Sequence, residues 1–238
     1  MKFINSAFVR TFTVACVLAH PTLEELVPPQ LYMTPFARVA SDCGCGEQDD
    51  AREAQREREQ RMDDVFKALD IRTGAVVADV GAGRGFYTVR LARAVGEGGK
   101  VYAIDISSSA LRDLRRRVER EGFYNVDVIE GAADNPRLPD AALDAVLIVN
   151  AYHEMTEHQA MLEGIRRALK PTGRLVILEP ISPSRRTSPR RDQTAQHEIS
   201  PELVLADVRK AGFTLASLEE AFARRSGHET EWLMVLTP

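Results

Sequence analysis

The ten residues from Val76 to Gly85 combine an apolar run, one acidic residue and three glycines. The apolar run predicts a buried strand, and the pattern from Phe86 to Val95 predicts a helix, so the glycines form a tight turn between the two. Gly81, Gly83 and Gly85 lack a Cβ atom, which permits positive φ angles and lets a ligand approach the backbone amides. This stretch therefore predicts a ligand site at a strand-to-helix turn.

The glycine spacing differs from the dinucleotide fingerprint G-x-G-x-x-G, in which the third glycine follows the second by three residues. Phe86 stands at that third position, and Gly85 comes one residue early. Asp79 also disfavours a pyrophosphate ligand, because a carboxylate repels phosphate and attracts a cation. The spacing and the acid favour a cationic ligand. The glycines taken alone are equally compatible with a purely structural turn.

A second acidic residue ends the next predicted strand, which runs from Lys100 to Asp105. Its distance in sequence from the glycine turn is close to that at which α/β nucleotide folds place an acid on the ribose hydroxyls. We therefore expect Asp105 to accept hydrogen bonds from both hydroxyl groups of a ribose.

The glycine turn, Asp79 and Asp105 together resemble motif I of class I S-adenosylmethionine-dependent methyltransferases, whose ligand carries an ammonium and a sulfonium group and no phosphate. The resemblance extends over roughly residues 62–238 and includes Leu169 to Arg174, which looks like the turn before the fifth strand in that family. It implies S-adenosylmethionine as the cofactor. It also implies a cofactor site made of Asp79, Gly81, Ala82, Gly83, Gly85, Asp105, Ile106, Ala133, Asp134 and Asn150.

The chain departs from the family pattern after the third predicted strand. Many relatives have Gly-Asp-Ala there, with the acid on the adenine amino group, whereas this chain has Gly131-Ala-Ala-Asp134. Asp134 takes over the adenine contact in one interpretation. In the other, the Ala133 backbone amide contacts the ring and Asp134 caps a turn.

Strand and helix patterns alternate along the rest of the chain, which predicts an open, mostly parallel sheet with helices on both faces. The resemblance implies a Rossmann-like, doubly wound sheet of seven strands with an antiparallel last strand. Ser107 to Gly122 and Ser200 to Gly212 each carry helix start and stop signals. Thr156 to Gln159 reads as a capping box that opens a helix through Leu169. Ligands of such sheets bind beyond the carboxyl ends of the strands.

The sequence from Asn150 to Glu154 follows the fourth predicted strand, where family members place residues against the methyl group and the acceptor. His153 is the candidate general base, Tyr152 a candidate lining of the methyl channel, and Asn150 a candidate for orienting the acceptor. The alternative for His153 is a capping or packing role at the next helix.

The predicted function is methyl transfer to a small molecule. A nicotinamide-dependent oxidoreductase and a non-catalytic S-adenosylmethionine-binding module are the alternatives.

The chain divides into a signal-like or disordered segment and linker (1–48), a charged leading helix (49–70) and the predicted methyltransferase domain (71–238). Among the 238 residues, 44% are hydrophobic, enough for one core of this size. The leading helix is either a lid over the cofactor or a solvated surface helix.

The N-terminal residues 1–19 carry two cationic side chains and a short apolar stretch, which is compatible with an export signal or with a loose N-terminus. The apolar stretch is too short to span a membrane. Export conflicts with the cytosolic origin of S-adenosylmethionine, so we favour a cytoplasmic location.

Charge and cysteine content limit the partners. The net charge of −4 gives no general attraction to nucleic acid, and a small-molecule acceptor is expected. Cys43 and Cys45 supply two of the roughly four ligands that zinc needs, so no metal site is predicted. The segment from Ile181 to Ser200 contains four arginines and reads as an anion site or as a mobile solvated loop. The oligomeric state is not indicated.

Overall fold

The computed structural model of the protein describes residues 45–224 and 230–238, with side chains from residue 51 onward. The predicted N-terminal segment, its candidate export signal and the cysteine pair Cys43 and Cys45 lie outside these residues or outside the described side chains. None of the helices within the described ranges has the length and apolar character that a membrane span requires.

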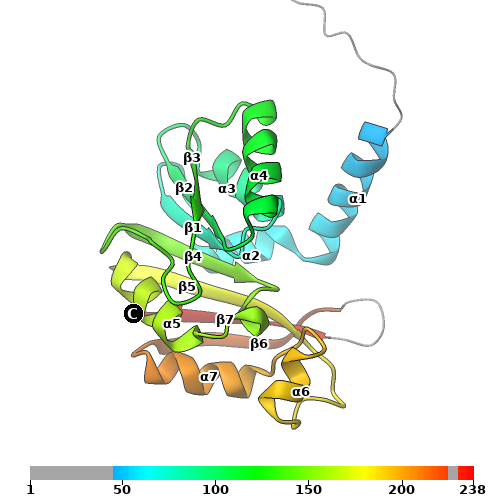
Figure 1. Cartoon of the computed structure of the whole chain (residues 1–238), viewed down its shortest axis with the longest axis vertical. Coiled ribbons are helices and arrows are strands. Elements are labelled where there is room, and N and C mark those ends of the chain that lie inside the picture. The colour runs from blue at the N-terminus through cyan, green and yellow to red at the C-terminus, as the bar shows by residue number, and fades with distance from the viewer. Residues whose placement is uncertain (1–44, 225–229) are drawn as a thin grey trace, which may run out of the picture. The chain divides into compact units, whose positions relative to one another are not determined.

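The described strands form one mixed sheet of seven strands in the order β3-β2-β1-β4-β5-β7-β6 (Figure 1). Strands β1 to β5 are parallel, while β7 runs antiparallel to both β5 and β6. The predicted Rossmann-like sheet with an antiparallel last strand is therefore confirmed. The strands are β1 (Val76–Val80), β2 (Lys100–Asp105), β3 (Val126–Glu130), β4 (Leu143–Val149), β5 (Leu169–Ile181), β6 (Thr214–Arg224) and β7 (Thr230–Thr237).

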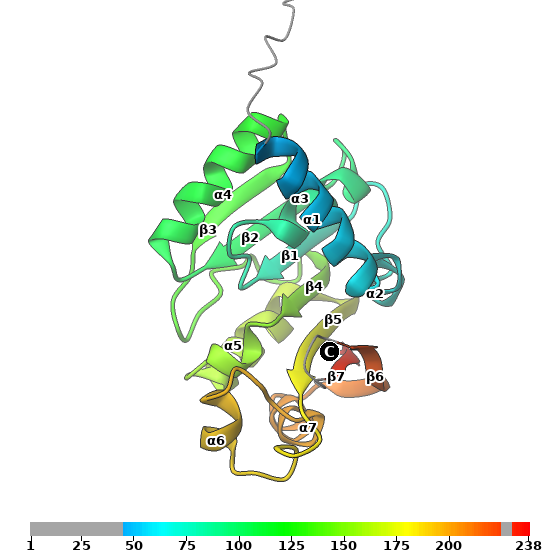
Figure 2. The ribbon, with the colours of Figure 1, turned by 90° about the vertical axis from the view of Figure 1, so that its right-hand side faces the viewer.

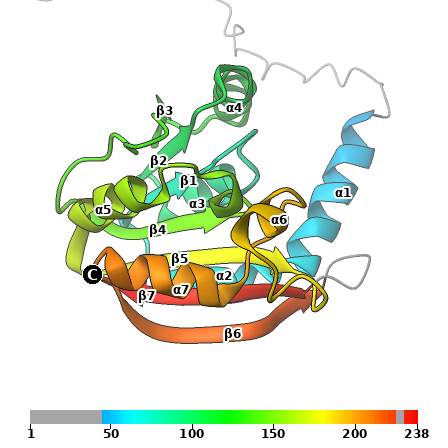
Figure 3. The ribbon, with the colours of Figure 1, turned by 60° about the horizontal axis from the view of Figure 1, so that its bottom comes forward.

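Helices cover both faces of the sheet, as Figure 3 shows for α5 and α7 on one side and α2 and α3 on the other. Helix α4 packs through its apolar side chains on β2, on the same face as α3. The described helices are α1 (Cys45–Glu59), α2 (Met62–Leu69), α3 (Phe86–Val95), α4 (Ser108–Glu121), the 3-10 helix η1 (Tyr152–Glu154), α5 (His158–Ala168), α6 (Arg190–Thr194) and α7 (Pro201–Lys210).

Strand β4 illustrates how the sequence produces this layering. Its continuous apolar run is buried on both faces, as expected for a central parallel strand. Val146 and Ile148 pack toward α5 and α7, whereas Ala145 and Leu147 pack toward α2 and α3. The period of two thus divides one strand between two hydrophobic cores.

Two of the three predicted helix starts agree with the structure. The Ser107 hydroxyl accepts a hydrogen bond from the Ala110 amide at the start of α4, and Gly122 ends that helix with a left-handed φ of 73°. Pro201 is the first residue of α7, with Ser200 before it. Ser107 thus makes the usual N-cap bond to a first-turn amide, whereas Ser200 makes no side-chain capping bond.

The predicted capping box at Thr156 is wrong. Helix α5 begins two residues later, at His158, and its N-cap Glu157 makes no capping side-chain bond. The preceding residues are taken up by η1, and the Gln159 amide donates to Glu163 on the next turn instead of reaching back. Helix α5 also ends at Ala168, because Leu169 already pairs with β4 as the first residue of β5.

Candidate active site

The glycine turn after β1 adopts a backbone that only glycine takes readily, with positive φ at Gly81, Gly83 and Gly85. A Cβ atom at Gly81 would lie 2.3 Å from the Cβ atom of Ala151, so the turn touches the segment after β4. A Cβ atom at Gly83 would meet no described atom within 4 Å. Gly83 therefore leaves open space over the turn, where a flat ligand can approach the backbone.

Asp105 at the end of β2 holds this turn in place. One carboxylate oxygen accepts from the Gly83 amide at 2.8 Å, and the other accepts from the Ser107 amide at 2.8 Å. Each oxygen has a further lone pair, so the same carboxylate is able to accept two ribose hydroxyls. The ribose contact of Asp105 stays a prediction, but its position beside the predicted ligand turn is now established.

Asp79 is buried beneath the turn, and its side chain accepts a hydrogen bond from the Thr88 hydroxyl at 2.6 Å. Burial raises the pKa of this carboxyl to about 6; the Thr88 hydrogen bond acts in the opposite direction, and the nearby Asp105 carboxylate raises the pKa further. The carboxyl group therefore titrates closer to neutral pH than an ordinary aspartate, and a nearby cation favours its ionised form.

The remaining predicted cofactor residues lie on the turns after β1, β2 and β3. Ala82 is buried, whereas Ile106 is 66% exposed directly after Asp105 and offers an apolar surface for a ring. Ala133 and Asp134 occupy the tip of an exposed turn that a bridge between Ala132 and Asn135 closes. Both interpretations of the adenine contact remain compatible with this geometry.

The segment after β4 is held by a buried acid from the neighbouring strand. Glu179 of β5 is fully buried, and its Oε1 atom accepts from the Ala151 and Tyr152 amides at 2.8 and 2.6 Å. Asn150 precedes them with a left-handed φ of 50°, a conformation that asparagine tolerates better than most residues. Glu179 also follows from the sequence as a strand-end candidate, because an acid near the end of a buried strand is the same signal that identifies Asp79 and Asp105.

The Glu179 carboxylate also orients His153. Oε2 of Glu179 lies 2.6 Å from Nδ1 of His153, and the His153 side chain is only 4% exposed. When Nδ1–H donates to Glu179, the lone pair of the neutral ring is on Nε2. A histidine fixed by a buried carboxylate is the arrangement used for general bases, so the catalytic interpretation of His153 stays a prediction with a defined geometry.

Tyr152 does not line an open channel. Its side chain lies in the hydrophobic core at 1% exposure, and its hydroxyl donates to Asp207 of α7 at 2.9 Å. Burial, followed by the nearby Asp207 carboxylate, raises the pKa of this hydroxyl well above its ordinary value. The predicted role of Tyr152 in the methyl channel is therefore replaced by a structural one, which ties η1 to α7.

The arginines of residues 181–200 are occupied by carboxylates, contrary to the anion-site alternative. Glu198 is buried and pairs with Arg185, while its Oε2 atom also accepts from the Ser182 amide and hydroxyl. The other described pairs are Arg186 with Glu202 and Glu220, Arg190 with Asp207, and Arg191 with Asp192. The segment is thus fixed by internal ion pairs.

Comparison with known proteins identifies the domain. Residues 77–173 match the family model described as a methyltransferase domain. The demethylmenaquinone methyltransferase of Geobacillus stearothermophilus is 33% identical over 121 residues, which is 51% of this chain and 52% of that protein. The ubiquinone/menaquinone biosynthesis C-methyltransferase UbiE of Escherichia fergusonii is 36% identical over 110 residues, 46% of this chain and 44% of that protein. The chain spans about half the length of the curated relatives it matches.

The fold extends the match beyond the aligned sequence. The crystal structure of a SAM-dependent methyltransferase from Aquifex aeolicus superposes with a TM-score of 0.65 at 26% identity, covering 79% of this chain and 98% of that one. The chain contains a class I S-adenosylmethionine-dependent methyltransferase domain. The matched range contains the glycine turn, Asp79 and Asp105, whose contacts with the cofactor stay predictions.

Helix α1 lies beside motif I of this methyltransferase domain (Figure 2). The Arg56 guanidinium is 3.9 Å from the ring centre of Phe86, the first residue after the glycine turn, and the Tyr87 hydroxyl donates to Gln60. Glu53 of α1 pairs with cationic side chains of α3 and α4. The leading helix is therefore anchored next to the cofactor turn. The lid interpretation of this helix stays a prediction.

Proposed function

We propose that the protein transfers the methyl group of S-adenosylmethionine to a small molecule. The observation that carries this proposal is the contact between the cofactor turn and the segment after β4, where Gly81 leaves no room for a side chain because Ala151 lies against it. The turn that would hold the methyl donor and His153, which would meet the acceptor, thus lie at one edge of the sheet.

The residues present fit this cofactor. Asp105 would accept the ribose hydroxyls, and Ile106 would cover the adenine ring. Asp79 would supply negative charge toward the cationic end of the ligand. Ala133 or Asp134 would complete the adenine site. The bound cofactor supplies an activated methyl group on a sulfonium, so the protein's main task is to align the acceptor and exclude water.

We propose that His153 receives the proton of an acceptor that starts protonated. Its Nε2 lone pair is set by the bond between Nδ1 and Glu179. The buried carboxylate also stabilises the imidazolium that forms. Such a base contributes about 10² to 10⁴ in rate. Asn150, beside His153 in the same segment, is the proposed group for orienting the acceptor.

The names of the curated relatives support a choice of acceptor class. Their names specify demethylmenaquinone and ubiquinone/menaquinone biosynthesis as the context of methylation, and the name UbiE specifies transfer to carbon. We propose hydroxylated rings of this quinol type as the first acceptors to test, because a hydroxyl proton gives His153 a role.

We also propose a cytoplasmic location, since the methyl donor is made in the cytosol. Fractionation of cells that express the native N-terminus tests this location.

Two measurements together test the proposal. Calorimetric titration with S-adenosylmethionine and separately with a nicotinamide dinucleotide identifies the cofactor, and incubation with methyl-labelled cofactor and reduced quinones detects transfer. We expect binding of S-adenosylmethionine and label in the acceptor. Binding without transfer across acceptor pools supports the non-catalytic module instead, and binding of the nicotinamide cofactor alone would restore the oxidoreductase interpretation.

A further inference from the structure

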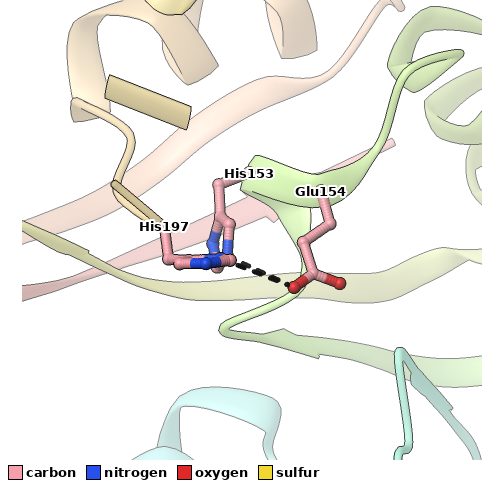
Figure 4. Close-up of side chains that lie close together, drawn as sticks. All are labelled: His153, Glu154 and His197. Carbon is pink, nitrogen blue, oxygen red and sulfur yellow. Dashed lines mark ion pairs between the residues drawn. The ribbon is translucent and has the colours of Figure 1, made fainter. Parts of the chain in front are cut away.

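Three potential metal ligands converge at the edge of the acceptor region. His153 and Glu154 belong to η1, and His197 comes from the connection between α6 and α7 (Figure 4). One ligand atom from each of the three lies within 4.8 Å of the others. Glu154 Oε1 is 3.8 Å from both His153 Nε2 and His197 Nδ1. Side chains 43 residues apart in sequence are thus brought together by the packing of η1 against α6.

The buried imidazole of His153 already has the arrangement of a metal ligand. Glu179 holds Nδ1, so the atom directed at Glu154 and His197 is Nε2. Metal-binding histidines almost always donate their other ring N–H to a carboxylate or carbonyl, which fixes the tautomer and increases the basicity of the ligating nitrogen. Glu179 therefore provides the outer contact that a metal site requires.

His197 is held in position by its sequence neighbours. Its backbone adopts a left-handed φ of 56°, which is uncommon for a residue with a Cβ atom. On one side, the buried Gln193 side chain donates to the Arg186 and Ser188 carbonyls, and on the other, Glu198 binds Ser182. The surrounding bonds maintain a backbone conformation that costs energy, so the backbone of His197 is fixed while its side chain, 78% exposed, can adjust.

The distances allow closure around an ion. Tetrahedral ligands about 2.0 to 2.1 Å from zinc are about 3.3 Å apart. The observed 3.8 Å separations exceed this by roughly half an ångström. Glu154 and His197 are exposed, so their side chains can move by this amount without disturbing the core. Two imidazoles and one carboxylate favour Zn²⁺, Co²⁺ or a similar transition metal over Mg²⁺ or Ca²⁺.

We propose that His153, Glu154 and His197 bind one divalent ion of the zinc type, with at least one coordination position left open. No metal site is predicted from the sequence, because Cys43 and Cys45 have no second cysteine pair and no matching histidine pair, and His197 lies far from His153 along the chain. The site does not depend on methyl transfer and is testable by binding alone. The ion uses the Nε2 lone pair of His153, so the metal-loaded protein cannot use that atom as a base.

Binding of the metal alone tests the proposal. The full chain, treated with a chelator and dialysed, is titrated with Zn²⁺ by calorimetry and with Co²⁺ by visible absorption. We expect one ion per chain. His197→Ala and Glu154→Gln should each weaken binding by about 100-fold or more, because removal of outer contacts already costs about 10- to 100-fold. His158→Ala and Glu157→Gln are matched controls from the same region and should bind as the native chain does.

The cysteine pair needs its own control. A chain with Cys43→Ser and Cys45→Ser should retain the ion and its Co²⁺ spectrum. Loss of binding in that chain, or native affinity in both His197→Ala and Glu154→Gln, would overturn the proposal and leave the three side chains as a charge cluster only. Both substituted residues are exposed, and circular dichroism confirms that each variant is folded. A protein that binds the ion but, after treatment with a chelator, transfers no methyl group would contradict the proposed function and not this site.

Discussion

Replacement of Asp79 by asparagine should stabilise the cofactor-free protein at neutral pH. Burial raises the pKa of Asp79 from its ordinary 3.8 to about 6. The difference of about 2 units corresponds to roughly 3 kcal/mol at 1.36 kcal/mol per unit. The folded state binds the Asp79 proton more tightly than the unfolded state does. The stabilisation that protonated Asp79 gives the folded state is therefore present below pH 3.8 and is lost as the pH rises toward 6. Asparagine carries no charge, and its carbonyl still accepts from Thr88.

The assay is urea denaturation of the native and Asp79→Asn proteins without cofactor between pH 4 and pH 8. The free energy of unfolding of the two proteins should be similar near pH 4, and the variant should become more stable by up to about 3 kcal/mol above pH 6. A difference that stays constant across this range would refute the reasoning, because it would mean that the Asp79 carboxyl titrates alike in both states.

Asp144 provides a control of opposite sign. Burial alone would raise its pKa, but the Lys170 ammonium and the Val76 amide bind its two oxygens and lower the pKa below the ordinary value. Its stabilising effect is therefore present above the unfolded pKa and is lost as pH falls. Asp144→Asn should destabilise the protein at neutral pH and have less effect in acid. Comparison of Asp79→Asn with Asp144→Asn separates the effect of burying a carboxylate from the general effect of removing one.

Three further predictions concern the cofactor turn and the proposed base. Asp105→Ala should weaken S-adenosylmethionine binding by about 1.5 to 3 kcal/mol, the usual value of charged hydrogen bonds, as measured by calorimetry; unchanged affinity in a folded variant would remove Asp105 from the site. Gly81→Ala should lower the melting temperature more than Gly83→Ala, because only the former places a Cβ atom 2.3 Å from a neighbour, and equal losses would contradict the described packing. His153→Ala should reduce turnover by about 10² to 10⁴ at saturating cofactor while cofactor affinity is unchanged; a loss below tenfold would exclude the base.

The residues that the sequence predicted well are those whose signal is local. The glycine turn, Asp79 and Asp105 stand at strand ends, and the alternation of apolar runs and helix caps is read directly along the chain. Because parallel strands place their carboxyl ends at one edge, these local signals combine into a site without further information. The fold and the position of these residues at one edge of the sheet were therefore predictable, while their contacts with the cofactor stay predictions.

The acceptor side depends on contacts between distant residues. Glu179 reaches His153 across 26 positions, and Tyr152 reaches Asp207 across 55. Glu179 has the local signal of an acid near a strand end, but nothing in the sequence pairs it with His153 or pairs Asp207 with Tyr152. The burial of Tyr152 and the orientation of His153 therefore emerge only from the packed chain. The same holds for His197, which lies in a segment that the sequence suggested was mobile. The misplaced start of α5 was a local error, because Thr156 satisfied a capping pattern that η1 displaced.

The anchoring of the segment after β4 also bears on how such a domain diversifies. Glu179 holds this segment through the Ala151 and Tyr152 amides, groups that every residue except proline possesses. The path of the chain is therefore set by its backbone and not by its exposed side chains. An exposed residue such as Glu154 is free to be replaced without loss of that path. New acceptor preferences are thus accessible by single substitutions, while the cofactor half of the domain stays unchanged.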